Sequence, residues 1–397
     1  MQVSQYAASI TPSATMAAGA KAKELKAQGI NVFDFATGEP DFITPAHICA
    51  AATQAMKDGH TKYTPSSGLI ELKQAVADYH RQWHGLDYAP ASICVSSGAK
   101  HTIYSALLAT LNPGDEVIIP TPYWVSYSEL VKMAGAVPIL VETTRKNRFL
   151  LKADQFRSAI TPKTKMLMLN SPSNPTGSAY AKDELESIAK IIVDKNLICL
   201  SDEIYERLIY TDTPFVAMAS FGKDVFDRTL TVNGVSKTYA MTGWRIGWTC
   251  GPANIIKAMD SIQGQQTSNP SSISQWAAIA ALRGEQQCVE QMKVEFVKRR
   301  DYVCQRLNAI AHLSIEPPDG AFYAFFDVSA YFGKTFGNVL VKDSQTFCLA
   351  LLEQGHVNTV QGSAFGAEGY ARMSFATSME TIRGGLDALE AWLATGK

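Results

Sequence analysis

Short apolar runs alternate with amphipathic helical stretches from about residue 46 onwards. Five such runs, each four to six residues long and bounded by Gly, Pro, Ser or Asn, cover 93–96, 116–120, 165–170, 197–202 and 229–233. Because these runs are apolar throughout instead of alternating, each is predicted to be a strand buried on both faces. Helical segments such as 183–195 lie between them, so the pattern predicts an α/β fold with a mostly parallel sheet.

Polar and aromatic residues follow each predicted strand at the same relative position. The five strands lead into residues 97–100, 121–124, 171–175, 201–205 and 234–237. In an open α/β sheet, ligands bind in a crevice outside the carboxyl ends of the strands. The five segments are therefore predicted to converge on one crevice.

The pattern changes after about residue 285. A long charged amphipathic helix over 286–310, two strands over 320–328 and 372–376, and a closing helix over Met379–Leu393 predict a smaller α+β domain. At the other end of the chain, a helix over 21–29 and an extended segment over 31–36 precede a break at 37–41. Since a single core rarely exceeds about 250–300 residues, we expect two domains. The expected division is 46–285 for the large domain, 286–397 for the small one, and 1–45 as a segment that packs on the small domain.

Composition excludes several classes of protein. The 397 residues are 46% apolar and 18% charged, with a net charge of −1, so nothing favours binding to nucleic acid or to an anionic membrane. The seven cysteines are scattered and form no C-x-x-C, which argues against a disulfide framework or a zinc site. His80 and His84 are spaced i, i+4 without a third ligand, so we expect surface residues and no metal. No apolar stretch approaches the roughly 18 residues that a membrane span needs. Residues 1–20 show no secretory signal pattern, so a cytoplasmic location is expected.

Lys237 is the strongest candidate for chemistry. It follows the predicted strand 229–233, a tight turn and Ser236, and Arg245 lies eight residues further on. A surface lysine beside a strand is the simple alternative. A desolvated lysine, however, becomes a nucleophile toward carbonyl groups, while a hydroxyl and a guanidinium fork suit a phosphate. A ligand that carries both an aldehyde and a phosphate is pyridoxal 5′-phosphate (PLP).

Residues 231–247 resemble the lysine motif of fold-type I PLP enzymes, and specifically of class I aminotransferases in the aspartate aminotransferase family. Further matching motifs run in the family's order from about Ser13 to Arg372. The resemblance implies a large PLP-binding domain, with a mostly parallel seven-stranded sheet between helices, and a smaller α+β domain. It also implies that Lys237 forms a Schiff base with PLP and acts as the catalytic residue.

The resemblance implies that four side chains contact the ring of the cofactor. Asp202 would hydrogen-bond the pyridine nitrogen, although a helix cap is the simple alternative for this residue. Asn174 and Tyr205 would hydrogen-bond the phenolic oxygen, and Asn174 is also a turn former before Pro175. Trp124 would stack on the ring, although most tryptophans of this kind are core residues. The bonds Asn174–Pro175 and Thr121–Pro122 are candidates for cis peptides.

The phosphate of the cofactor would be held where a helix begins. Gly98, Ala99 and Lys100 follow a predicted strand, and small residues there let backbone N–H groups reach an anion. The backbone of Lys100 is expected to contribute, and its ammonium to be solvated. Ser236 and Arg245 would complete this phosphate site.

The resemblance also implies a substrate site and a partner subunit. Arg372 would grip the α-carboxylate of the substrate, with an internal ion pair as the alternative, and the backbone amide of Gly38 would meet the same carboxylate. Trp124 and Asn174 would contact substrate as well, and Ser13 and Thr15 would lie near its side chain. Tyr63 would reach across the interface of a homodimer to the neighbouring cofactor phosphate.

The function implied by the resemblance is transfer of an amino group between L-aspartate and 2-oxoglutarate through PLP and pyridoxamine phosphate. Prephenate or aromatic amino acid aminotransferases remain alternatives, because no second arginine for a distal carboxylate is evident in the sequence. Another fold-type I reaction, such as that of a C–S lyase, also stays open. A PLP-binding regulatory protein is disfavoured, because only about 30 residues precede Asn31 and the net charge is near zero.

Overall fold

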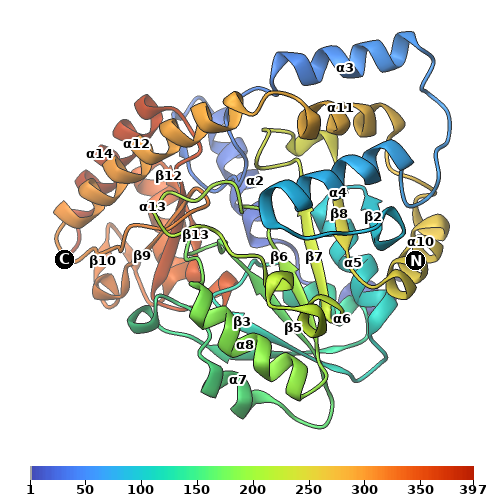
Figure 1. Cartoon of the computed structure of the whole chain (residues 1–397). Helices are drawn as coiled ribbons and strands as arrows, with labels where there is room; N and C mark the ends of the chain where they lie inside the picture. The colour runs from blue at the N-terminus through green and yellow to red at the C-terminus, as the bar shows by residue number, and fades with distance from the viewer. Residues whose placement is uncertain (1) are drawn as a thin grey trace.

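A seven-stranded sheet forms the centre of the computed structural model, which describes residues 2–397 (Figure 1). Its strands lie in the order β2-β8-β7-β6-β5-β3-β4. In chain order they are β2 (Ile93–Ser96), β3 (Glu116–Thr121), β4 (Val137–Glu142), β5 (Thr164–Asn170), β6 (Ile198–Asp202), β7 (Thr229–Gly234) and β8 (Gly247–Cys250). Strand β8 runs antiparallel to both of its neighbours, β2 and β7, and the other neighbouring pairs are parallel. The predicted mostly parallel sheet of seven strands is therefore confirmed.

Helices cover both faces of this sheet, which explains why its strands are apolar throughout. In β3, Val117 and Ile119 pack in one core cluster, whereas Ile118 packs in another on the opposite face. The first cluster includes residues of α5 (Ala99–Thr110), α6 (Tyr127–Met133) and α10 (Ala253–Gln266). The second includes residues of α7 (Ala153–Ala159), α8 (Lys182–Asp194) and α9 (Lys223–Phe226), and a third lies under α3 (Ala46–Lys57), α4 (Ile70–His84) and α11 (Ser272–Arg283).

Two strands of the large sheet were not predicted. Strand β4 lies at the sheet edge, and its residues are half-buried or exposed, although its sequence Val-Pro-Ile-Leu-Val-Glu is as apolar as those of the other strands. Strand β8 has only four residues, Gly-Trp-Thr-Cys, which follow a glycine-rich turn. The apolar pattern identified four inner strands and the four-residue edge strand β2, but it missed β4 despite its apolar residues and β8, which is buried but has only four residues.

The C-terminal elements, coloured orange to red in Figure 1, gather on one side of the sheet. They contain α12 (Gln287–Ala309), α13 (Ser344–Gly355), α14 (Met379–Leu393) and an antiparallel sheet of order β13-β14-β9. Its strands are β9 (Tyr323–Asp327), β13 (Val360–Gln361) and β14 (Tyr370–Ser374), and a hairpin is formed by β10 (Thr335–Phe336) and β11 (Val339–Leu340). The predicted helices 286–310 and Met379–Leu393 and the strand 320–328 are confirmed. The predicted strand 372–376 begins two residues earlier, and α13 was missed.

From residue 14 onwards the N-terminal segment lies against these C-terminal elements, whereas Tyr6 donates a 3.2 Å hydrogen bond from its hydroxyl to the Met133 carbonyl on α6. The segment contains α1 (Gln5–Ala8), α2 (Ala14–Ala27) and β1 (Phe33–Asp34), and β1 pairs in parallel with β12 (Val357–Asn358). Helix α2 begins seven residues before the predicted start at residue 21. The extended segment after α2 includes β1 and continues to Gly38.

The expectation that His80 and His84 lie on the surface is wrong. His80 has no exposed area, and its Nε2 accepts a 3.0 Å hydrogen bond from Trp248 Nε1. The His84 side chain is 5% exposed, and its Nε2 lies 3.6 Å from a carboxylate oxygen of Glu206. Both belong to the inner face of α4, among aromatic rings, where burial lowers their pKa values to about 3 and about 4. Two histidines on one helix face are as compatible with a buried face as with an exposed one, so their spacing alone could not decide.

Three peptide bonds before proline are cis. Thr121–Pro122 and Asn174–Pro175 are the two that the sequence nominates, and Ser171–Pro172 is a third. None of the helices within residues 2–397 has both the length and the apolar character that a membrane crossing requires.

Candidate active site

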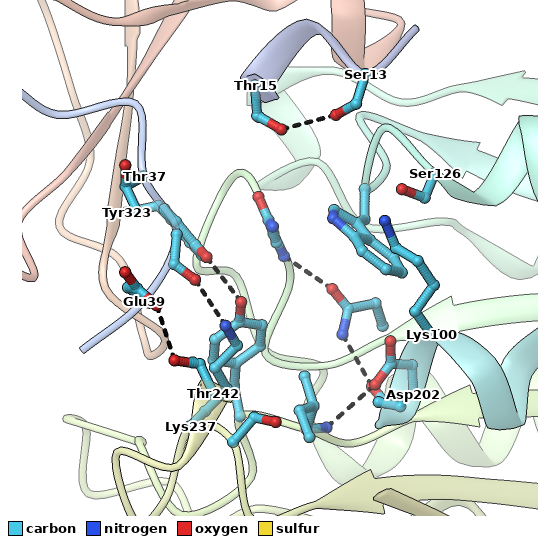
Figure 2. Close-up of a pocket in the computed structure, with 18 of the residues that line it drawn as sticks. Ser13, Thr15, Thr37, Glu39, Lys100, Ser126, Asp202, Lys237, Thr242 and Tyr323 are labelled. Atoms are coloured by element: carbon cyan, nitrogen blue, oxygen red, sulfur yellow. Dashed lines mark hydrogen bonds between the residues drawn. The ribbon is translucent and has the colours of Figure 1, made fainter. Parts of the chain in front are cut away.

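A cavity of about 440 Å³ opens at the carboxyl ends of the central strands (Figure 2). Its walls come from the N-terminal segment, from the loops after β2, β3, β5, β6 and β7, and from β9 and β14. The predicted site residues that line it are Ser13, Thr15, Gly38, Ala99, Lys100, Trp124, Asn174, Asp202, Tyr205, Ser236, Lys237, Arg245 and Arg372. The predicted convergence of the strand ends on one crevice is therefore confirmed.

Two predicted site residues do not line the cavity of this chain. Gly98 immediately precedes Ala99, which lines the cavity, and its lack of a side chain leaves room for Arg245. Tyr63 lies elsewhere, with 89% of its surface exposed. Tyr63 therefore contributes nothing to the cavity of its own chain.

Lys237 presents its amine to the cavity. It follows β7, and its Nζ donates a 2.6 Å hydrogen bond to the carbonyl oxygen of Gly38, as Figure 2 shows. Burial lowers the pKa of Lys237 to about 8, and the nearby Glu39 partly opposes this shift. An amine with this pKa is neutral far more often at pH 7 than a solvated lysine, as nucleophilic attack on a carbonyl requires.

Asp202 ends β6 as a buried carboxylate. Its Oδ2 accepts a 2.6 Å hydrogen bond from the Tyr127 hydroxyl, and its Oδ1 accepts one of 3.2 Å from the Ile204 amide. Burial raises its pKa to about 6, and these two hydrogen bonds oppose the rise. No helix begins directly after β6 in the described residues 2–397, so the alternative of a helix cap is wrong.

Glycines bring three groups that favour an anion close together. Gly98, with φ of +89°, precedes the first residue of α5, and a Cβ at this position would collide with Nη2 of Arg245. Gly247 lets β8 approach the backbone of Ala99 in the same way. The N-terminus of α5, the guanidinium of Arg245 and the buried hydroxyl of Ser236 therefore meet at one end of the cavity, and such a combination suits a phosphate.

Arg372 is a buried cation without an acidic partner. Its residue is 1% exposed, and its Nη1 and Nη2 donate to Asn174 Oδ1 at 2.9 Å and to the Ala36 carbonyl at 2.5 Å. None of the ion pairs formed within residues 2–397 includes Arg372, and its buried Nε has no hydrogen-bond partner. The alternative of an internal ion pair is wrong. A buried charge of this kind is costly unless an anion enters the cavity.

Several cavity residues were not found from the sequence. Tyr127 and Tyr323 hydrogen-bond Asp202 and Tyr205, respectively. Asn170 donates from Nδ2 to the Asp202 carbonyl at 2.9 Å and accepts the backbone N–H of Asn174 at 2.8 Å. The remaining ones are Met16, Thr37, Glu39, Ser126, Ile204 and Thr242. Its position as the last residue of β5 is the signal for Asn170, but no signal separates Tyr127 or Tyr323 from ordinary core aromatics.

Lys100 adds a second cation to the cavity wall. Although the residue is exposed, its Nζ lies 4.9 Å from the centre of the Trp124 ring, and Figure 2 shows its side chain beside the cavity. Desolvation, followed by the charge of Arg245, lowers its pKa. The hydroxyls of Ser13 and Thr15 lie 2.9 Å apart at the start of α2 and also line the cavity. The expectation that the Lys100 ammonium is merely solvated is therefore too simple, because it faces a site for ligands.

The mostly parallel seven-stranded sheet, with a desolvated lysine at its carboxyl edge, is the arrangement of the fold-type I enzymes, which include aminotransferases. The chain belongs to the family aminotransferase class I and II, whose model matches residues 30–389. It is 46% identical over 382 residues to an aspartate aminotransferase of Bacillus sp. (strain YM-2), covering 96% of both chains. It is 44% identical to an aspartate/prephenate aminotransferase of Cereibacter sphaeroides, covering 99% of this chain and 98% of the relative. The structure of the aspartate aminotransferase of Thermus thermophilus with maleate has a TM-score of 0.93 and 40% identity, with 98% and 99% coverage. The protein is a transaminase.

Proposed function

We propose that the protein is a PLP-dependent aminotransferase that moves an amino group between L-aspartate and 2-oxoglutarate. The observation that carries the proposal is the position of the Lys237 amine, with a pKa of about 8, in one cavity with Asp202, Arg245 and Arg372. These four side chains supply a nucleophile, a buried carboxylate and two cations. A site that binds a phosphorylated aldehyde and an amino acid side by side requires this set of groups.

The cavity fits PLP at each of its polar ends. Arg245, Ser236 and the first amides of α5 would hold the phosphate, because Gly98 permits their close approach. Asp202 would hold the ring nitrogen. Asn174 uses its Oδ1 for Arg372, so its Nδ2 is left to donate to the phenolic oxygen together with Tyr205. Trp124 would cover one face of the ring, and its own edge contact with Tyr127, at 5.4 Å and 88°, fixes its plane.

When bound, PLP supplies an electron-deficient ring that accepts the electron pair released when the substrate Cα–H bond breaks. Asp202, with a pKa of about 6, is mostly ionised at neutral pH and would keep a proton on the ring nitrogen. Lys237 Nζ would remove the proton from Cα and deliver one on the way to product. Its pKa near the working pH suits both the acid and the base role.

Arg372 and the backbone of Gly38 would orient the substrate through its α-carboxylate. Arg372 is held in place by Asn174 and Ala36, and its ring contact with Tyr323, 4.5 Å from guanidinium to ring centre, limits its movement. A planar fork grips a carboxylate with two parallel hydrogen bonds. This grip fixes the direction of the Cα–H bond relative to Lys237.

The preference for a dicarboxylic substrate rests on Lys100 and on the relatives. Lys100 is a cation on the cavity wall that forms none of the ion pairs within residues 2–397, and the hydroxyls of Ser13 and Thr15 line the same cavity. The Thermus thermophilus relative was solved with maleate, a dicarboxylate, and the Bacillus relative is named for aspartate. Prephenate is also a dicarboxylate, and the name of the Cereibacter sphaeroides relative makes it the second candidate acceptor.

The proposal includes a homodimer and a division into domains. Tyr63 is 89% exposed and lies outside the cavity of its own chain, as a residue that serves a partner's cofactor phosphate would. Residues 263–270 would belong to the same interface. The large domain would comprise residues 46–285, and residues 1–45 would pack on the small domain of 286–397. Light scattering tests the dimer, and recovery of activity from mixed Tyr63→Phe and Lys237→Ala subunits tests the sharing of sites.

A steady-state screen with purified protein and PLP tests the function. L-Aspartate, L-glutamate, L-phenylalanine and L-tyrosine serve as donors, with 2-oxoglutarate, oxaloacetate and prephenate as acceptors. Aspartate with 2-oxoglutarate is expected to give the highest kcat/KM, and Lys237→Ala to abolish turnover, whereas the exposed Lys257→Ala should not. Transamination by Lys237→Ala at the wild-type rate would refute the proposed role of the lysine.

A further inference from the structure

Tyr323 connects the small antiparallel sheet to the floor of the cavity. It lies at the start of β9, it is 1% exposed, and its hydroxyl lies 2.7 Å from the hydroxyl of Tyr205. The two rings meet edge to face at 5.8 Å and 84°. No other hydrogen bond is made by either hydroxyl within residues 2–397. One of the two hydroxyl protons therefore lies in the hydrogen bond between the tyrosines, and the other is free to be donated to a group in the cavity.

We propose that Tyr323 is a positioning residue that donates its proton to Tyr205, so that the Tyr205 hydroxyl donates into the cavity toward the phenolic oxygen of PLP. This inference rests on the proposed function. Both residues line the cavity, but Tyr205 lies only three residues after Asp202, the carboxylate assigned to the ring nitrogen, whereas Tyr323 lies on β9 of the small sheet. If Tyr205 instead donated to Tyr323, its only proton would be used within the protein and could not stabilise an anionic oxygen.

The same face of the small sheet holds Tyr323 and Arg372. Arg372 on β14 pairs with Phe325, two residues from Tyr323 on β9, so Arg372 and Tyr323 point to the same side. The Arg372 guanidinium lies 4.5 Å from the centre of the Tyr323 ring. Through this contact, Tyr323 links the group that would bind the substrate carboxylate to the group that would hold the cofactor oxygen.

Charged and titratable groups surround the hydroxyl pair from several elements. Asp202 comes from β6, Arg372 from β14 and Lys237 from the loop after β7, and Tyr127 adds a hydroxyl that is bound to Asp202. Burial raises the pKa of both tyrosines, so both keep their protons throughout the working range. A change in the bound cofactor caused by loss of the Tyr323 hydroxyl would therefore report a lost hydrogen bond and not the titration of a tyrosine.

The test is a double-mutant cycle of Tyr323→Phe and Tyr205→Phe, read from the absorbance of the PLP-loaded protein as a function of pH. Tyr205→Phe removes the donor to the phenolic oxygen, and Tyr323→Phe weakens that donor by removing the hydrogen bond that orients it. Each change disfavours the deprotonated form of the phenolic oxygen, so each variant should raise the midpoint of the titration. We expect Tyr323→Phe to raise it by about half a unit to one unit, as the net strength of one hydrogen bond implies. The double variant should match Tyr205→Phe alone, because Tyr323 acts through Tyr205.

Tyr331→Phe is the matched control. Tyr331 is another buried tyrosine near β9, and its hydroxyl donates to the Ala311 carbonyl at 2.5 Å, outside the cavity. It should lower thermal stability without moving the midpoint. An unchanged midpoint in Tyr323→Phe, or shifts that add in the double variant, would overturn the inference. Wild-type protein that binds no PLP would overturn the proposed function together with it, so the two failures are distinguishable.

Discussion

The hydroxyl of Tyr127 donates a 2.6 Å hydrogen bond to Oδ2 of Asp202, and both residues are almost completely buried. Tyr127 is the first residue of α6, and its ring contacts Trp124 edge to face. One aromatic side chain therefore orients both the carboxylate and the indole that the proposed cofactor would contact. Without this hydrogen bond, burial alone would push the pKa of Asp202 further above its usual range.

Tyr127→Phe is expected to weaken PLP binding by about tenfold or more, because a hydrogen bond to a charged group contributes roughly 1.5–3 kcal/mol. The pKa of Asp202 should rise above about 6, so the loss of cofactor affinity should grow as the pH falls toward that value. Fluorescence titration of the apo-protein with PLP from pH 5.5 to pH 8 measures both effects. Tyr104→Phe is the control, since its hydroxyl makes only a 3.4 Å contact with the Met133 carbonyl. Equal affinities of wild type and Tyr127→Phe at all pH values would contradict the role given to Tyr127.

The pKa of Lys237 predicts the pH dependence of cofactor capture. Burial lowers this pKa to about 8, and only the neutral amine attacks an aldehyde, so the rate should rise with pH and level off above about 8. Stopped-flow absorbance after mixing apo-protein with PLP gives the midpoint. Glu39 raises the pKa of Lys237, so Glu39→Gln should move the midpoint to lower pH. A wild-type midpoint above pH 10 would show that the amine is solvated.

Gly98→Ala tests the phosphate site by steric means. The added Cβ would collide with Nη2 of Arg245 and also meets an unfavourable φ of +89°. Gly59→Ala is the matched control, because its φ of +78° imposes a similar backbone strain while its Cβ would meet no atom within 4 Å. Both variants should lose about 1 kcal/mol of stability from the backbone. Only Gly98→Ala should also bind PLP and inorganic phosphate more weakly, by about tenfold, as isothermal titration would show.

Lys100→Met tests how a second carboxylate is recognised. The loss of a charge-assisted hydrogen bond should lower kcat/KM for L-aspartate by about ten- to a hundredfold. The value for L-phenylalanine, which has no distal carboxylate, should change by less than about threefold. Steady-state kinetics with both donors, and Lys257→Met as an exposed control, provide the measurement. An equal loss for both donors would assign Lys100 to the cofactor and not to the substrate.

The parts of the fold that sequence could predict are those whose residues are buried on two faces. Strands β3, β5, β6 and β7 are apolar without interruption, and their position in the centre of the sheet is the cause. Strand β4 was missed although residues 137–141 are apolar, and the 48% exposure of Leu140 shows that an apolar run need not be buried on both faces. The pairing of β4 with β3 depends on contacts made by the rest of the sheet, which the residues of β4 alone do not reveal.

The site could be predicted where chemistry demands an unusual residue type in an apolar context. Lys237, Asp202 and Arg372 are charged residues at or within apolar strands, and each lines the cavity. Tyr127 and Tyr323 differ from these charged residues, because buried tyrosines are common. Only the hydrogen-bond partner of each tyrosine reveals its role. These partners, Asp202 and Tyr205, lie 75 and 118 residues away along the chain, so their contacts follow from tertiary packing.

The pairing of β1 with β12, which joins residues 33–34 to 357–358, has a consequence for biosynthesis. Gly38 and Ser13 leave the ribosome first, whereas Arg372, whose guanidinium donates to the Ala36 carbonyl, leaves among the last. The central sheet can form while translation continues, but β1 has no partner strand until β12 emerges. Ribosome-bound chains arrested before residue 357 should therefore be cleaved readily by proteases near their beginning, although their middle is already protected.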